Sequence, residues 1–152
     1  MPNFRAPHAL PGVVLDTNAV LDWLVFRDRG MQIWARAIEQ ARLQWLACAP
    51  MRDELQRTLA YAPLARWQPD PAQVLATFDR WSCPCSLPHG TLLPGLRCTD
   101  ADDQVFVDLA LAEGARWLVT HDRALLRLAK TTRRRGLLVL RPEAGAAALE
   151  AL

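Results

Sequence analysis

Two aspartates each stand just beyond a short apolar run, where a carboxylate can take part in chemistry. Asp16 directly follows the apolar residues 13–15, and Asp122 follows the apolar residues 117–119 after a threonine and a histidine. Short apolar runs bounded by turn-forming residues predict buried strands. The carboxyl ends of parallel strands lie along one edge of a sheet, where ligands bind in α/β proteins. Asp16 and Asp122 therefore share that edge if their strands are close neighbours.

Two further acids belong to helices that begin at the same edge. Asp103 lies in the first turn of a predicted helix over residues 102–113, and the positive N-terminus of a helix favours an anion. Glu54 lies in a predicted helix over residues 50–59, which follows the second strand. These positions predict that four carboxylates converge.

Converging carboxylates imply a particular chemistry. Such groups repel one another and persist where a cation neutralises them. Ligands that are all oxygen favour Mg²⁺ or Mn²⁺ over zinc. These ions hydrolyse phosphodiesters by activating water and stabilising the phosphate under attack. The alternative is that each acid has an ordinary local role, because aspartates commonly cap strand-to-helix turns and a helix glutamate is commonly solvated. Asp102 and Asp53 also compete with their neighbours for any role in a site.

Strands and helices alternate along the chain. Strands are predicted at residues 13–15, 43–49, 117–119 and 137–140, with a further short strand an option within the irregular stretch 82–94. Helices are predicted at residues 18–26, with Asn18 as N-cap, and at 31–41, 50–59, 72–81, 102–113 and 123–130, with a helical turn within 61–71 and a short helix from Pro142. Alternation of this kind favours a mostly parallel sheet covered on both faces. The predicted fold class is α/β, a three-layer α/β/α sandwich.

The composition indicates a globular protein. The chain has 152 residues, 51% of them hydrophobic and 22% charged, which predicts a single domain over residues 1–152 with a core at about 13–143. The net charge of +2 neither requires nor excludes a nucleic-acid partner. Because the sequence contains neither a signal-peptide pattern nor a long apolar segment, we expect a cytoplasmic protein without a membrane partner. Reduced cysteines are expected there, and Cys83-Pro84-Cys85 lacks the spacing of a zinc site.

The sequence resembles a known family, the PIN-domain ribonucleases, and in particular the VapC-like toxins of toxin–antitoxin systems. The resemblance rests on five stretches in order: Val14-Leu15-Asp16-Thr17-Asn18, Glu54-Leu55, Cys98-Thr99-Asp100-Ala101-Asp102-Asp103, residues 110–122 continued by Leu125-Leu126, and Pro142-Glu143. Together they extend from about residue 13 to residue 143. Residues 61–94 contain no landmark of the family, and His121 stands where a small or basic residue is usual.

The resemblance implies a site and a function. Asp16 and Asp103 would be the main ligands of Mg²⁺ or Mn²⁺, Asp122 would bind the ion directly or through water, and Glu54 would hold a second ion or a metal-bound water. Asp103 is preferred to Asp102 because it lies 11 residues before Gly114. The implied activity is endonucleolytic cleavage of single-stranded RNA. The implied partners are a cognate antitoxin and a second copy of the chain.

Several polar and basic residues beside these acids are candidate contacts for the substrate. Asn18 and Thr120 either orient ligands and bind phosphate or serve only as turn residues. Arg123, Arg127 and Lys130 are spaced to lie on one face of the predicted helix, with three more arginines at 133–135. Such a stripe either follows an RNA backbone or is a solvated helix face.

The six tryptophans fall into two groups. Trp34, Trp45 and Trp117 lie within apolar patterns and are predicted to be core residues. Trp23 and Trp67 are candidates for an interface, because tryptophan is enriched at interface hot spots.

Two other functions compete with the nuclease. A catalytically silent PIN-like module that binds RNA or protein is one, but the presence of all four acids argues against it. A phosphohydrolase with Asp16 as nucleophile is the other. That chemistry usually needs a second aspartate two residues on, where this chain has Asn18.

Overall fold

The computed structural model describes residues 10–87 and 101–152. It contains a five-stranded sheet with the order β3-β2-β1-β4-β5, and every neighbouring pair is parallel. The strands are β1 (Gly12–Leu15), β2 (Gln44–Ala47), β3 (Ser82–Pro84), β4 (Trp117–Val119) and β5 (Leu138–Leu140). The sheet confirms the predicted strands and the optional short one after residue 81.

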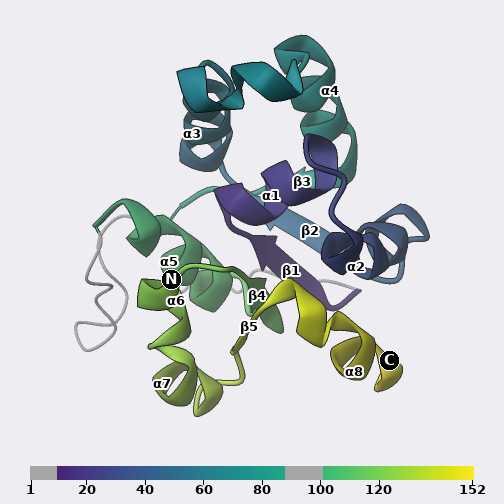
Figure 1. The fold of residues 1–152 in the computed structure, drawn as a ribbon. Helices are drawn as coiled ribbons and strands as arrows, with labels where there is room; N and C mark the ends of the chain where they lie inside the picture. The colour runs from purple at the N-terminus through teal and green to yellow at the C-terminus, as the bar shows by residue number, and fades with distance from the viewer. Residues whose placement is uncertain (1–9, 88–100) are drawn as a thin grey trace.

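Helices cover both faces of this sheet and make the predicted three-layer sandwich (Figure 1). The helices are α1 (Thr17–Leu24), α2 (Arg29–Glu39), α3 (Ala49–Leu59), α4 (Pro71–Trp81), α5 (Gln104–Ala112), α6 (Arg123–Leu126), α7 (Ala129–Arg133) and α8 (Gly145–Glu150), with 3-10 turns η1 (Ala62–Trp67), η2 (Ala101–Asp103) and η3 (Pro142–Ala144). Figure 1 shows α3 and α4 beside the β3 end of the sheet and α7 beside the β5 end. No helix in the described parts of the chain is long and apolar enough to span a membrane.

The core lies against the central strands. Trp34, Trp45 and Trp117 are almost fully buried, as predicted. Trp34 and Trp117 meet edge to face with their ring centroids 5.7 Å apart, and Trp45 packs on Phe78 at 4.9 Å. Aromatic pairs of this geometry add to the stabilisation from burial alone.

The pairing of β1 with β4 sets the position of the site. Val14 lies opposite Leu118 and Leu15 lies opposite Val119. The Asp16 amide continues the ladder by donating to the Val119 carbonyl at 3.1 Å. The two acid-bearing strand ends are therefore direct neighbours.

Most predicted helix ends differ from the structure by one to three residues, and two differences bear on the site. Asp16, rather than Asn18, is the N-cap of α1, and Asn18 is exposed within the first turn. The helix predicted at 123–130 is divided into α6 and α7. The Leu128 amide bonds to the Leu125 carbonyl three residues back, which tightens the turn, and α7 then packs against β5.

Candidate functional site

Asp16 is a buried carboxylate at the carboxyl end of β1, with only 3% of the residue exposed. Its Oδ1 accepts a hydrogen bond from the Ala19 amide at 2.7 Å, which caps α1. Its Oδ2 accepts a short hydrogen bond from the hydroxyl of Thr120, a residue that is fully buried at the end of the neighbouring strand. The carboxylate is thus fixed by one backbone donor and one side-chain donor.

The surroundings of Asp16 disfavour its charge. Burial raises the pKa of Asp16 to about 6, against the lowering effect of the hydrogen bonds from Thr120 and Ala19. His121 lowers this pKa further and the negative charge of Asp122 raises it. A raised pKa in a fixed carboxylate indicates an anion that its hydrogen bonds do not fully compensate.

Thr120 connects Asp16 to Asp122. Its Oγ1 atom accepts a hydrogen bond from the Asp122 amide at 2.9 Å while its proton goes to Asp16. Asp122 caps α6 by accepting from the Ala124 amide at 2.7 Å. Both aspartates are therefore N-caps, as the local alternative predicted, but they also lie close enough to influence one another electrostatically.

Glu54 reaches the same region from α3. Its Oε2 accepts a hydrogen bond from the Thr17 hydroxyl at 3.0 Å, and Thr17 is the residue directly after Asp16. Glu54 is half-buried, whereas Asp53 is exposed one position earlier. Glu54 is therefore the residue of this pair that contacts α1.

Asp103 is not brought into one ligand cluster with the other acids. It is half-buried at the end of η2, where the exposed Asp102 precedes it, and Cys98, Thr99 and Asp100 lie outside the described residues. Within residues 10–87 and 101–152, no three His, Cys, Asp or Glu side chains lie close enough to hold a metal ion together. The structure therefore joins Asp16 to Asp122 through Thr120, and Glu54 to Thr17, without a complete metal centre.

A hydrogen bond that the sequence did not indicate links the loop after β4 to α1. His121 Nε2 lies 2.8 Å from Asp22 Oδ2 on α1. Burial raises the pKa of Asp22, while His121 lowers it. Because 99 residues separate the two side chains, no local spacing could have revealed the contact. The Thr17 contact also went unpredicted, although Thr17 stands beside Asp16.

The remaining candidate residues lie at the surface. Asn18 is exposed in the first turn of α1, Arg123 is exposed at the start of α6, and Arg127 is exposed where α6 ends. Arg127 and Lys130 belong to different helical segments because the predicted helix is divided. The prediction of one continuous basic helix face was therefore wrong, although the basic residues themselves are solvent-accessible.

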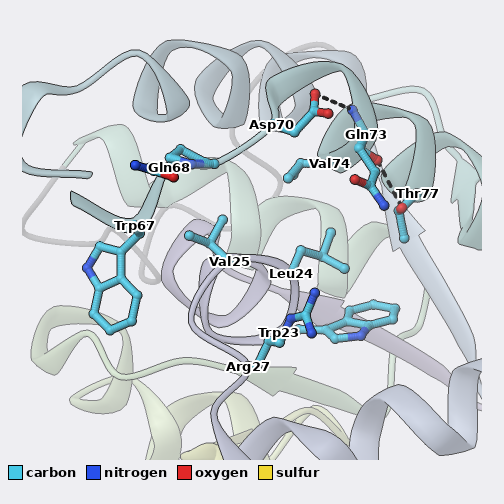
Figure 2. Close-up of a pocket in the computed structure, with 11 residues that line it drawn as sticks. Trp23, Leu24, Val25, Arg27, Trp67, Gln68, Asp70, Gln73, Val74 and Thr77 are labelled. Atoms are coloured by element: carbon cyan, nitrogen blue, oxygen red, sulfur yellow. Dashed lines mark hydrogen bonds between the residues drawn. The ribbon is translucent and has the colours of Figure 1, made fainter. Parts of the chain in front are cut away.

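Candidate residues line two hollows in the described part of the chain. The first lies between the end of α1 and the start of α4, with Trp23, Trp67 and Asp70 in its wall (Figure 2). Its volume is about 400 Å³. A second hollow, of about 560 Å³, has Glu54 and Asp102 in its wall. The second hollow therefore opens beside Glu54 and Asp102.

Comparisons with known proteins agree with this geometry. None of the curated proteins matches the chain. Among solved structures, the crystal structure of VapBC2 from Rickettsia felis, bound to a DNA fragment from their promoter, matches with a TM-score of 0.55. The match has 15% sequence identity and covers 84% of this chain and 96% of that one, which supports a common fold. A family model described as PIN domain matches residues 12–124. The match spans both strand-end aspartates and Glu54, and the chain belongs to the PIN domain family.

Proposed function

We propose that this protein is a metal-dependent endoribonuclease that cleaves single-stranded RNA. The observation that supports the proposal most strongly is the buried carboxylate of Asp16, linked through the Thr120 hydroxyl to Asp122 at the edge where parallel strands end. Membership of the PIN domain family agrees with it.

The donor types suit Mg²⁺ or Mn²⁺. Both are hard cations that prefer carboxylate oxygens, and a cation would relieve the electrostatic cost that raises the Asp16 pKa. Asp16, Asp103, Asp122 and Glu54 would hold the ion. Such an ion supplies a nucleophilic water and stabilises charge on the phosphate.

The other residues of the site have positioning or binding roles in this proposal. Thr120 orients the Asp16 carboxylate, and Thr17 holds Glu54 toward it. Asn18, Arg123 and Arg127 bind phosphates of the RNA backbone from the rim.

We further propose that the nuclease is the toxin of a toxin–antitoxin pair and forms a homodimer. The likeness in fold to VapBC2 from Rickettsia felis, which was solved bound to a DNA fragment from their promoter, supports the first point. Co-expression with the product of an adjacent small reading frame should relieve growth inhibition and yield a complex. Light scattering at tens of micromolar should report a mass twice the 17.0 kDa of one chain.

A cleavage assay tests the activity. The purified protein should cut single-stranded RNA when Mg²⁺ or Mn²⁺ is present and lose this activity in EDTA. Asp16→Asn should reduce the rate at least ~100-fold, as loss of a metal ligand would, whereas the exposed Asp53→Asn should cleave normally. Undiminished cleavage by the purified Asp16→Asn protein would remove the proposal.

A further inference from the structure

The hollow beside Glu54 has an aromatic and a basic residue in its wall as well as acids. Arg57 and Tyr61 line it together with Glu54 and Asp102, and its volume is about 560 Å³. An aromatic ring next to a cation is the combination that binds single-stranded nucleic acid, because bases stack on the ring and the cation meets the phosphates.

Two of these residues lie on α3, and Tyr61 follows it. Glu54 and Arg57 stand at positions i and i+3 of α3, which are neighbours on a helix face. The Tyr61 amide donates to the Thr58 carbonyl at 3.0 Å, and the backbone of Tyr61 is extended where it caps η1. The chain therefore leaves α3 at Tyr61, and Tyr61 still lines the same hollow as Glu54 and Arg57.

Tyr61 exposes more of its surface than any other large hydrophobic residue in the described chain. It is 64% exposed, and it is the one tyrosine of the sequence. Trp67, the other exposed aromatic residue nearby, instead packs edge to face on Phe26 at 4.9 Å. Within the described residues, Tyr61 has no such ring partner and the exposed Arg57 has no salt bridge. Both side chains are therefore open to a ligand from solvent.

We propose that Tyr61 and Arg57 form a nucleotide subsite next to the scissile bond. One base of the single-stranded RNA stacks on the Tyr61 ring, and Arg57 binds the phosphate beside it. Because Glu54 lines the same hollow, this base lies next to the cleaved linkage. This inference rests on the proposed ribonuclease function. It identifies the surface that the RNA contacts next to the carboxylates.

The single tyrosine gives a direct binding test. Protein labelled with 3-fluorotyrosine carries its ¹⁹F signal at Tyr61 alone. The Asp16→Asn background keeps RNA intact during the measurement. A single-stranded RNA of about ten nucleotides, within the length that such sites bind, should shift this signal in parallel with its fluorescence anisotropy. Anisotropy that reports binding while the ¹⁹F signal stays unchanged would overturn the subsite and leave the ribonuclease proposal standing.

Substitutions test the two side chains separately. Tyr61→Ala should weaken RNA binding about 5- to 140-fold, the range expected for loss of one stacked base, whereas Tyr61→Phe should bind like the parent. Arg57→Ala should weaken binding and lower its salt dependence, unlike the control Arg42→Ala at the opposite end of β2. In active protein, these losses should raise KM much more than they lower kcat. If Tyr61→Ala bound RNA with the same affinity as the control Trp67→Ala, the subsite would be refuted. If the parent neither bound nor cleaved RNA, the ribonuclease function would be refuted as well.

Discussion

At the scale of single residues, the fold buries the Asp16 carboxylate without fully compensating its charge. The Asp16 pKa of about 6 lies above the value of 3.8 for an exposed aspartate. Because the folded state holds this proton more tightly than the unfolded state, Asp16 favours folding below pH 4 and loses that contribution as pH rises through 6. The loss amounts to roughly 3 kcal/mol for a shift of this size.

The first prediction follows from this linkage. Without metal, Asp16→Asn should be more stable than the parent at pH 7 and equally stable near pH 4, because the amide retains the helix cap but carries no charge. Denaturant unfolding in EDTA at several pH values measures the difference. Parallel stability curves for the two proteins across pH 4–7 would contradict the burial argument.

The second prediction concerns Thr120, whose hydroxyl links the two aspartates. Thr120→Val keeps the shape but leaves Asp16 Oδ2 and the Asp122 amide without this partner. The free energy of unfolding should fall by about 1–3 kcal/mol, the cost of unsatisfied buried groups, and RNA cleavage should fall with it. Thr120→Ser keeps the hydroxyl and should be close to the parent in both. A valine variant with normal cleavage would show that Asp16 needs no orienting bond.

At the scale of elements, packing determines which chain segments support the site. The C-terminal helix α8 approaches α2 closely at Gly145, where an added Cβ would come within 2.6 Å of the Trp34 indole nitrogen and of Ile33. That nitrogen donates a hydrogen bond to the Pro142 carbonyl at 3.0 Å. The absence of a side chain at Gly145 therefore allows α8 to pack closely against α2.

The third prediction follows from this contact. Gly145→Ala should lower the free energy of unfolding by about 1–3 kcal/mol, because a well-packed core must shift to admit the methyl group. The exposed Ala146→Gln, one position later in α8, should change stability little. Thermal unfolding of the two variants would contradict this packing if their melting temperatures fell equally.

Much of this architecture could be predicted from the sequence, because short apolar runs and helical spacing are local signals. The runs before Asp16 and Asp122 located two strands, and the helix over 102–113 ends at the expected glycine. Nothing local could place β4 beside β1, since the register depends on the crossover between distant segments. The division of the predicted helix at residues 127–128 has a similar cause, because α7 packs on β5, a contact that no local pattern of the sequence indicates.

The candidate site was predictable in part for the same physical reason. Acids that follow parallel strands lie along one edge of the sheet, so a shared edge for Asp16 and Asp122 could be predicted, whereas their direct proximity depends on the pairing of β1 with β4. Contacts made by side chains across elements could not, and the Thr17–Glu54 and Asp22–His121 bonds appeared only in the structure. The roles of Asn18, Asp103 and the rim arginines stay predictions.

At the scale of the whole molecule, charge distribution matters more than net charge. The net charge is only +2, yet residues 123–135 contain five arginines and a lysine with no acid among them. All six side chains are exposed, and the first of them, Arg123, directly follows Asp122. An RNA strand that reaches the carboxylates can therefore contact this basic segment, although the protein as a whole carries little net charge.

The fourth prediction is a salt dependence. Each phosphate contact to single-stranded RNA contributes about 0.7 to the slope of log affinity against log salt. The double substitution of Arg123 and Arg127 by alanine should lower that slope by about 1.4, whereas the control Arg36→Ala on α2 should leave it unchanged. Fluorescence anisotropy over a range of potassium chloride concentrations measures it. An unchanged slope in the double variant would show that Arg123 and Arg127 make no phosphate contacts.

The central claim is that the buried carboxylates bind a divalent cation, and a Mn²⁺ titration of thermal stability tests it most directly. At 100 times its dissociation constant, Mn²⁺ should stabilise the parent by about 2.7 kcal/mol, and the exposed-site control Asp53→Asn should gain as much. Asp16→Asn, although more stable without metal, should gain much less. Equal Mn²⁺ shifts in Asp16→Asn and the parent, or no shift in the parent, would contradict the claim that Asp16 is part of a metal site.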